Sequence, residues 1–356
     1  MKKISLTEVR ISDKARKRVD EVLLSGRIGQ GPLIQEFEEK FAEWVGSKYA
    51  IAVSSGTMAD TIALAVLKYL KPEQDEVLIP ALTFAAQLNA VLYNGLKPVF
   101  FDIERYGFGQ SFHHKVNEKT LCASLVSLLG FPCRNHSTDK AVVLEDTCEA
   151  MGTSIDGKKC GTYGRMGTFS FFPSHTMTTG EGGMIVTDDA DCADIARTLR
   201  NHGKTSGSDF HFDVVGFNGK ITSIQAAIGI EALKNVDDDI KRRRENWLFL
   251  GGKEPLNTFI SPHAFPVICE SKTERDSMMN RLVENGIECR NLFSSLPTQE
   301  EAYAFLGYKL GDFPEAERIG DCGLYVPCHQ YLEKQDLYRI KEIISEKEAQ
   351  KAPVLA

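Results

Sequence analysis

Short apolar runs and longer amphipathic stretches alternate along the N-terminal part of the chain. The short runs are bounded by Gly, Pro or polar residues and predict strands at 49–53, 75–80, 97–103, 122–130 and 141–147. The longer stretches predict helices at 32–46, 57–70 and 85–95. Strands that alternate with helices indicate an α/β fold, with a mostly parallel central sheet flanked by helices on both faces.

After Gly183 the chain continues with a strand and three predicted helices, at 189–203, 221–236 and 237–250. The next residues, 251–263, are rich in Gly, Pro and polar side chains, and we interpret them as a linker. Beyond it the pattern predicts a strand, a helix, a strand and a closing helix. We therefore predict a large domain over 1–250 and a small α+β C-terminal domain over 251–356.

Composition and charge narrow the class of protein. The chain has 356 residues, of which 42% are hydrophobic and 26% charged, as in ordinary globular enzymes. Its net charge of −7 argues against a nucleic-acid partner, which requires a basic face. No apolar core follows the N-terminal lysines, and no run of about 18 apolar residues occurs, so we expect a cytoplasmic protein without a membrane segment.

The nine cysteines are scattered, without a CxxC or CxC spacing. This pattern predicts free thiols in a reducing compartment. We expect neither a metal site nor an iron–sulfur cluster built from them.

The segment SSGT, residues 54–57, lies between a predicted strand and a predicted helix. Backbone N–H groups and the helix dipole attract phosphate at such a point. Gly56 permits close approach of the backbone, and Thr57 adds a hydroxyl group. The alternative interpretation is an ordinary helix N-cap.

Two further strand ends carry groups suited to a flat, polar ligand. The motif LEDT ends a buried strand with Glu145 and Asp146, and the carboxyl ends of strands face the ligand crevice of open α/β sheets. A buried carboxylate requires a partner, for which a protonated aromatic nitrogen is suitable. A helix cap or a structural ion pair explains the motif equally well. Phe84 follows another strand and is suited to stack on a ring, or to pack in the core.

The stretch FSFFPSHTMTTGEGG, residues 169–183, contains Ser170 and His175 and leads into a glycine-rich turn. The later segment GFNGK places Asn218 and Lys220 before a predicted helix, where both could reach an anion. A solvated loop is the plain alternative for the latter. Together these motifs, in this order, point to a cofactor with one phosphate and one aromatic ring, and pyridoxal phosphate fits best.

With these motifs, the sequence resembles the DegT/DnrJ/EryC1/StrS family of sugar aminotransferases, which have fold type I of the pyridoxal phosphate enzymes. The resemblance covers most of the chain. It is carried by GQGPLIQEFEEKFAEWVG, AVSSGTMAD, DEVLIPALTFAA, LKPVFFDIE, LEDTCEAMG, GTFSFFPSHTMTTGEGGMIVTDD, RNHG and VGFNGKITSIQAAIG, and more weakly by CRNLFSSLPTQEEAYAFLG and GLYVPCHQYL.

The resemblance implies a role for each matching residue. Gly56, Thr57 and Ser170 would hold the cofactor phosphate, and Phe84 would stack on its ring. Asp146 would keep the ring nitrogen protonated, and Glu149 would lie near the ring hydroxyl. The resemblance also implies a homodimer with shared sites. In it, Asn218 would bind the cofactor phosphate of the neighbouring subunit, and Arg27 and Lys220 would bind the substrate.

One position departs from the family's aminotransferases, which carry a lysine where this chain has His175. That lysine bonds covalently to the cofactor and moves a proton, whereas imidazole serves only as a general base. The family's nucleotide-sugar 3-dehydratases also have a histidine here. They bind pyridoxamine phosphate without a covalent link and remove the C3 hydroxyl of a 4-keto-6-deoxy sugar. That branch often shows a second histidine next to the first, where this chain has Thr176.

The leading hypothesis is therefore a 3-dehydratase acting on a nucleotide-linked keto sugar, with His175 and Asp146 as catalytic residues and glutamate as amino donor. The second hypothesis is an aminotransferase in which Lys204 or Lys220 takes the place of the usual lysine, or in which His175 is an engineered change. The third is a non-catalytic homologue that binds the cofactor or a nucleotide sugar.

Overall fold

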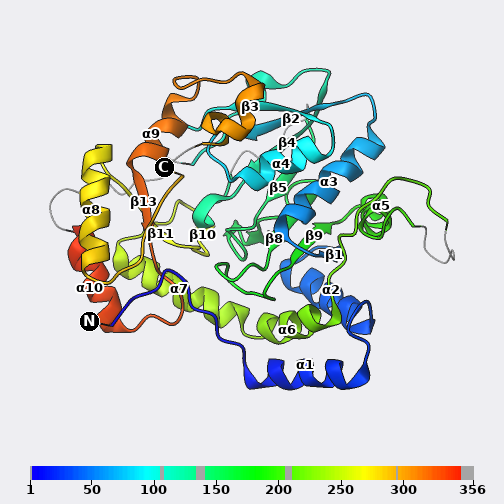
Figure 1. Cartoon of the computed structure of the whole chain (residues 1–356), viewed down its shortest axis with the longest axis horizontal. Helices are drawn as coiled ribbons and strands as arrows, with labels where there is room; N and C mark the ends of the chain where they lie inside the picture. The colour runs from blue at the N-terminus through cyan, green and yellow to red at the C-terminus, as the bar shows by residue number, and fades with distance from the viewer. Residues whose placement is uncertain (1, 105–107, 134–140, 205–210, 294–295, 346–356) are drawn as a thin grey trace.

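A twisted seven-stranded sheet forms the centre of the computed structural model, which describes residues 2–104, 108–133, 141–204, 211–293 and 296–345 (Figure 1). The strand order is β1-β9-β8-β5-β4-β2-β3. The strands are β1 (Tyr49–Val53), β2 (Glu76–Pro80), β3 (Lys97–Phe101), β4 (Thr120–Val126), β5 (Val143–Asp146), β8 (Met166–Ser170) and β9 (Gly183–Thr187).

The sheet is mostly parallel. β3, β2, β4, β5 and β8 run in one direction, whereas β9 is antiparallel to both β8 and β1. In the register of the two central strands, Asp146 pairs with Thr168. The carboxyl ends of β5 and β8 therefore meet at one edge, where a ligand crevice is expected in an open α/β sheet.

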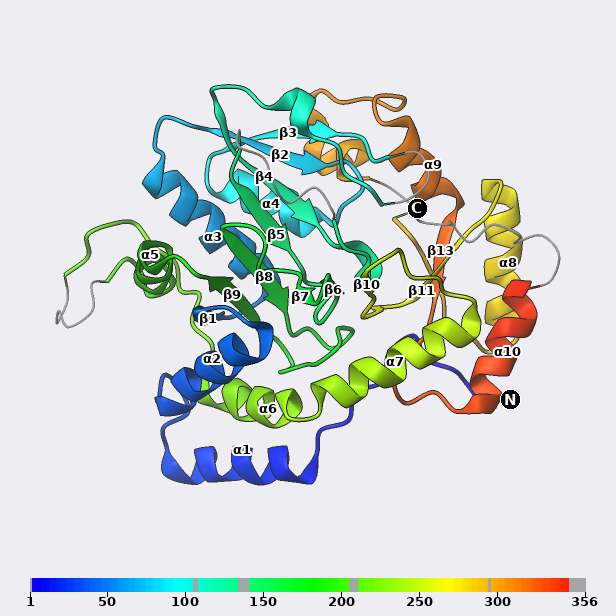
Figure 2. The same ribbon diagram turned by 180° about the vertical axis from the view of Figure 1, so that it is seen from behind.

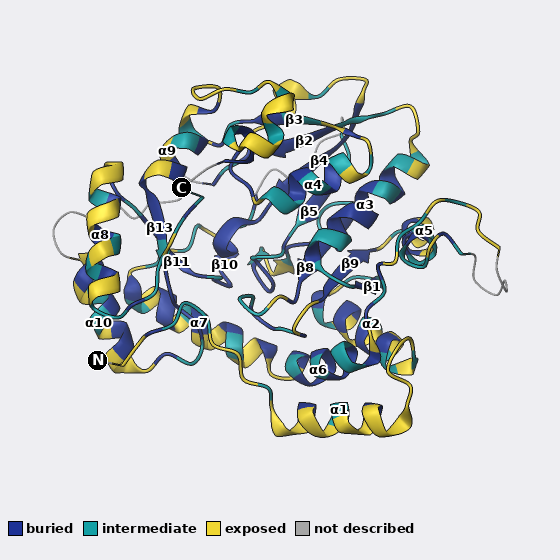
Figure 3. Cartoon of the chain, in the orientation of Figure 1, coloured by how far each residue is buried: buried dark blue, intermediate teal, exposed yellow. Residues whose placement is uncertain are grey.

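Helices cover both faces of the sheet, as the sequence predicts. One face packs on α2 (Pro32–Val45) and α6 (Ser223–Leu233), and the other on α3 (Gly56–Leu70), α4 (Ala85–Tyr93) and α5 (Ala190–Arg200). Outside them, α1 (Asp13–Ser25) lies against α6, with its outer surface exposed (Figure 3). The two larger of three apolar clusters among the described residues include Phe37, Phe41 and Ile51, which are all fully buried.

The helix boundaries follow from local chemistry. Ser55 caps α3 by accepting a hydrogen bond from the backbone N–H of Met58. Thr222 and Gln225 form a reciprocal capping box at the start of α6. The predicted strand over 122–130 ends earlier than expected, at Val126. It gives way to a short 3-10 turn, η2 (Leu128–Gly130), in which Leu129 has a φ of 53°.

The C-terminal part packs on a smaller sheet of order β11-β13-β12, made of β11 (Phe265–Ile268), β13 (Gly323–Val326) and β12 (Arg290–Asn291). The helices α8 (Lys272–Glu284), α9 (Pro314–Cys322) and α10 (Lys334–Ser345) surround it. The long helix α7 (Val236–Leu250) extends from α6 toward this part, as Figures 1 and 2 both show. The remaining 3-10 turns are η1 (His113–Lys115), η3 (Pro297–Gln299) and η4 (Glu301–Leu306).

The segment interpreted as a linker is packed at its C-terminal end. Here β10 (Thr258–Phe259) pairs with β6 (Ser154–Ile155), which also pairs with β7 (Lys158–Lys159). Ser261 is fully buried, and its backbone N–H donates to Thr153 Oγ1 over 3.0 Å. The C-terminal end of the predicted linker is therefore attached to the large domain through paired backbone groups. The domain boundary at 250/251 stays a prediction.

The fold class is confirmed, and each predicted helix and strand has a counterpart in the structure. The nine cysteines all lie among the described residues and form no disulfide. The described helices include none long and apolar enough to cross a membrane. The sequence also predicts a frayed tail over 347–356 and a loop over 202–215 that contacts the substrate. The tail and residues 205–210 of the loop lie outside the described residues.

Candidate active site

The SSGT turn at the start of α3 lies directly against Ser170 at the end of β8. Gly56 opens α3, and a Cβ atom built on it would lie 2.7 Å from Ser170 Cβ and 3.0 Å from Cys148 Sγ. Only glycine therefore fits at this position without displacing a neighbour. Thr57 follows directly within the first turn of α3. The structure thus brings together three residues predicted to hold a phosphate, at a helix N-terminus that favours anions.

Asp146, at the end of β5, lies in an acidic and largely buried environment. Its Oδ1 accepts a hydrogen bond from the Cys148 N–H over 3.1 Å. Asp60 of α3 is only 2% exposed and accepts from Thr168 Oγ1 over 2.6 Å. One carboxylate oxygen of Asp60, one of Asp146 and the Sγ atom of Cys148 all lie within 4.8 Å of one another.

Burial raises the pKa of both carboxyl groups, and the charge of Asp146 raises the pKa of Asp60 further. Two carboxylates this close resist full ionisation unless a cation joins them. A protonated ring nitrogen is such a cation, so Asp146 suits the predicted pairing with a pyridinium.

Glu149 supports the turn next to this cluster. Its Oε2 accepts a hydrogen bond from the Leu129 N–H over 2.8 Å. Burial raises the pKa of Glu149 to about 7, an effect that the Leu129 hydrogen bond opposes. Glu149 therefore holds the strained Leu129 turn at the edge of the site.

His175 lies in the loop between β8 and β9, where its backbone N–H donates to the Phe172 carbonyl over 3.0 Å. It contributes to the wall of a cavity of about 290 Å³ that also involves Arg10, Asp239 and Tyr331. The Arg10 guanidinium lies 4.3 Å from the centre of the Tyr331 ring. Burial lowers the pKa of His175 to about 4, and the nearby charge of Arg243 adds to this effect. The imidazole is therefore neutral at neutral pH, as a general base must be.

A second histidine lies beside the first. The ring centres of His175 and His263 are 5.2 Å apart, and the ring planes are inclined by 53°. Arg243 of α7 is 3% exposed and donates through Nη1 to the carbonyls of Pro262 and His263. The buried cation thus fixes the backbone that carries His263.

The other predicted residues lie at exposed or separate positions. Phe84 is the N-cap of α4 and is 68% exposed, so its ring is free to cover a ligand. Asn218 is exposed, and Lys220 forms a β-bridge with Val53. Arg27 is exposed between α1 and α2 and does not contribute to the cavity at His175. The roles of these residues stay predictions.

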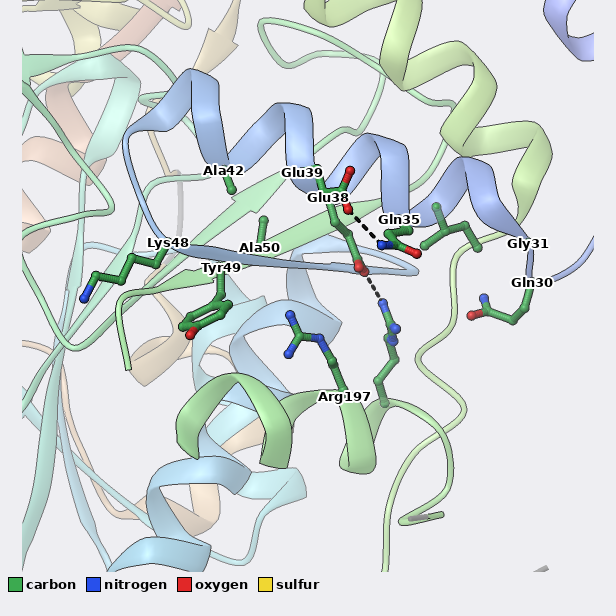
Figure 4. Close-up of a pocket in the computed structure, with 12 residues that line it drawn as sticks. Gln30, Gly31, Gln35, Glu38, Glu39, Ala42, Lys48, Tyr49, Ala50 and Arg197 are labelled. Atoms are coloured by element: carbon green, nitrogen blue, oxygen red, sulfur yellow. Dashed lines mark hydrogen bonds and ion pairs between the residues drawn. The ribbon is translucent and has the colours of Figure 1, made fainter. Parts of the chain in front are cut away.

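A larger hollow, of about 510 Å³, lies elsewhere, between α2, β1 and α5 (Figure 4). Figure 4 shows Arg197 beside Tyr49 and the hydrogen bond between Gln35 and Glu39. This hollow includes none of the predicted cofactor residues. The size of a hollow therefore does not identify the candidate active site, whereas the arrangement of its functional groups does.

A family model for the DegT/DnrJ/EryC1/StrS aminotransferases matches residues 9–345. The chain belongs to this family. Its members are pyridoxal phosphate-dependent enzymes that act on nucleotide sugars, as aminotransferases or as 3-dehydratases. The glycine cradle, the helix N-terminus and the buried acid at a strand end fit this cofactor's phosphate and ring nitrogen.

Relatives of both reaction types are similar to the chain. GDP-perosamine synthase of Escherichia coli O157:H7 is 34% identical over 97% of this chain and 99% of its own length. GDP-4-keto-6-deoxy-D-mannose 3-dehydratase of Yersinia pseudotuberculosis is 31% identical over 89% of this chain and 92% of its own. A solved structure of the Escherichia coli 3-dehydratase with bound hydrated pyridoxal phosphate has a TM-score of 0.87 and 28% identity, covering 96% and 99% of the two chains.

Sequence reasoning missed three residues of this site: Asp60, Arg243 and His263. Asp60 left a signal, because an acidic residue on an otherwise apolar helix is costly unless it is paired. Arg243 lies in the charged run KRRRE, which resembles a solvated helix face. His263 lies in the segment interpreted as a linker, so nothing local pointed to a role.

Proposed function

We propose that the chain is a pyridoxamine phosphate-dependent 3-dehydratase that acts on a GDP-linked 4-keto-6-deoxy sugar, with His175 as the base. The observation that carries this proposal is His175 itself, at the position that the family resemblance assigns to the covalent lysine of the aminotransferases. The lining of the cavity at His175 includes no lysine among the described residues. The names of the two relatives described above support a GDP-linked substrate.

When bound, the cofactor supplies an amine for the sugar ketone and a ring that takes up electrons. Gly56, Thr57 and Ser170 would bind its phosphate, and Phe84 would cover its ring. Asp146 would hold a proton at the ring nitrogen. His175 would accept a proton on a ring nitrogen of its imidazole, and that proton would leave with the C3 hydroxyl of the sugar as water.

The proposed assembly is a homodimer with shared sites. Asn218 of one subunit would reach the cofactor phosphate of the other, and Lys220 and Arg27 would contact the substrate. The exposure of Asn218 and Arg27 in the single chain is compatible with contacts supplied across a subunit interface. Glutamate is the proposed donor of the amino group that returns the cofactor to its amine form.

The test is incubation of the purified protein with GDP-4-keto-6-deoxymannose, pyridoxamine phosphate and glutamate, followed by mass spectrometry of the sugar. We expect loss of the C3 hydroxyl, and abolition of that loss in His175→Asn. Replacement of the keto oxygen by an amine, with the C3 hydroxyl retained, would contradict the proposal.

That outcome would favour the second candidate, an aminotransferase. It is supported by the 34% identity to a perosamine synthase and by Thr176, which follows His175 as in the family's aminotransferases. Lys220 is its best-placed lysine, because burial and the charge of Arg200 lower the pKa of its amine. Borohydride reduction with pyridoxal phosphate, followed by peptide mapping, would identify any lysine that bonds to the cofactor.

A further inference from the structure

Two histidine rings meet in the interior of the site, and neither has its inner nitrogen paired. Nδ1 of His175 and Nδ1 of His263 are both buried without a hydrogen-bond partner among the described residues. A buried polar atom left unpaired costs about 1–3 kcal/mol. Two such atoms, on rings whose centres are 5.2 Å apart, reduce the stability of the fold. Their retention therefore indicates that the histidine pair has a role in the function of the site.

The surroundings fix His263 in place. Its backbone N–H donates to the Leu129 carbonyl over 3.2 Å, and its carbonyl accepts from Arg243 Nη1 over 3.0 Å. The segment before it is also held, because Gly130 lies directly against the backbone of Ser261. His263 is thus attached to the large domain through the same turn that Glu149 supports.

The charged groups that act on the two rings are cations, although the Asp239 carboxylate lines the same cavity as His175. Arg243 of α7 acts on both rings, and Arg290 of β12 acts on His263. Burial and these charges lower the pKa of both imidazoles, so both rings are neutral at neutral pH. A neutral imidazole has one donor nitrogen and one acceptor nitrogen. His263 therefore has a free lone pair to offer when its neighbour gains a proton.

We propose that His263 is a positioning residue for His175, which accepts a hydrogen bond from the His175 ring and stabilises it once that ring has taken a proton. This inference rests on the proposed function of His175 as a base. The proton stays on His175 and is shared through the hydrogen bond, so His263 forms no bond to the substrate. The torsion about the Cβ–ring bond of histidine is broad, so rings whose centres are 5.2 Å apart can turn toward each other.

The test compares four proteins with isotope-labelled histidine: the wild type, His263→Leu, His263→Asn and His114→Leu. His114 is exposed on η1 and provides the control. The signals of His175 are assigned from the spectrum of His175→Asn. Because one hydrogen bond is worth about 1 kcal/mol, His263→Leu should lower the pKa of His175 by about one unit. Asn retains an acceptor and should restore part of the shift.

Turnover provides the second measurement. We expect His263→Leu to reduce kcat about tenfold and to change KM by less than about threefold. The substitution destabilises the protonated form of His175, which arises during the reaction and not on substrate binding. His263→Asn should recover part of kcat, and His114→Leu should match the wild type. Unchanged ring signals of His175 together with unchanged kcat in His263→Leu would overturn the proposal.

If His263→Leu does not fold, His263→Ala takes its place, because alanine also lacks an acceptor. Identical His175 titrations in wild type and His263→Ala would then overturn the inference. The titration requires no substrate, so it separates this inference from the proposed function. If the His175 pKa responds to His263→Leu but no dehydration is detected, His263 remains the partner of His175. Only the 3-dehydratase assignment is then contradicted.

Discussion

At the scale of single residues, the proposed function depends on the side chain at position 175, which would determine what the site can do to its cofactor. An amine at this position can bond covalently to pyridoxal phosphate and also carry a proton, whereas an imidazole can only carry the proton. The cavity beside it keeps this imidazole neutral, because burial and Arg243 both disfavour the charged ring. The same surroundings would also keep a lysine amine neutral and nucleophilic.

His175→Lys is therefore expected to gain a covalent bond to pyridoxal phosphate. Borohydride reduction and peptide mapping should label the substituted residue in most of the protein, and the same treatment should label no single lysine in the wild type. Dehydration should fall at least a hundredfold in this variant, because the geometry of the base changes. His175→Asn, which can neither bond nor accept the proton, is the control. Specific labelling of Lys220 in the wild type would contradict this expectation.

The stability of the protein should also report the ionisation of His175. Its pKa is about 4 in the folded protein and about 6.5 when unfolded. Between these values the unfolded chain binds more protons, so this residue's contribution to the free energy of unfolding falls as the pH drops from 6.5 to 4. The His175→Asn variant should lose about 2 kcal/mol less than wild type between pH 6.5 and 4.5, measured by urea unfolding.

Other groups titrate in the same range but are present in both proteins. Burial also lowers the pKa of His329 to about 4, which gives the same direction, whereas the raised pKa of Glu149 gives the opposite one. The difference between the two proteins isolates His175. Equal losses in both would show that the ring titrates normally in the folded state.

At the scale of elements, the phosphate cradle depends on how closely the start of α3 approaches β8. Gly56→Ala should place a methyl group within 2.7 Å of Ser170 Cβ, so that α3 or Ser170 must move. We expect a loss of about 1–3 kcal/mol in stability, as for other overpacked sites, and at least a tenfold loss in cofactor affinity, measured by absorbance titration. Gly29→Ala is the matched control, because a Cβ there meets nothing within 4 Å.

An unchanged cofactor affinity in Gly56→Ala would place the phosphate elsewhere. A loss of stability alone, with affinity intact, would show that the close approach serves packing only. Both measurements use the full chain and need no sugar substrate.

The elements themselves were predictable from sequence, and the contacts between distant segments were not. Helix α3 follows from an apolar run and a serine cap, both of which act within a few residues. The turn at Leu129 was not predictable from the local sequence, because a leucine with a φ of 53° is stabilised by Glu149 from a different segment. The approach of His263 to His175 did not follow either, since no local pattern encodes it.

At the scale of the whole molecule, the proposed shared sites predict that two inactive variants can complement each other. His175→Asn and Asn218→Ala would each inactivate both sites of their own homodimer. A mixed dimer would contain one site with an intact histidine and an intact asparagine. A mixed dimer, isolated through one tag on each variant, should therefore show about half of the wild-type activity, if the dimer has two-fold symmetry.

The measurement is the dehydration rate after co-expression and purification through two different tags. Each variant mixed with itself is the control. Activity no greater than the sum of the two separate variants would show that each site is built from a single chain.

The first residues of the chain line the cavity at His175 and also join the C-terminal part. Ile4 exchanges backbone hydrogen bonds with Gly286 and Glu288, and the Lys2 amine lies 3.1 Å from the Glu333 carboxylate. A growing chain on the ribosome cannot make these contacts until nearly all of it has been synthesised. The wall formed by Arg10 and its neighbours should therefore be completed only after synthesis ends, so nascent chains that lack the C-terminal part should not yet bind the sugar.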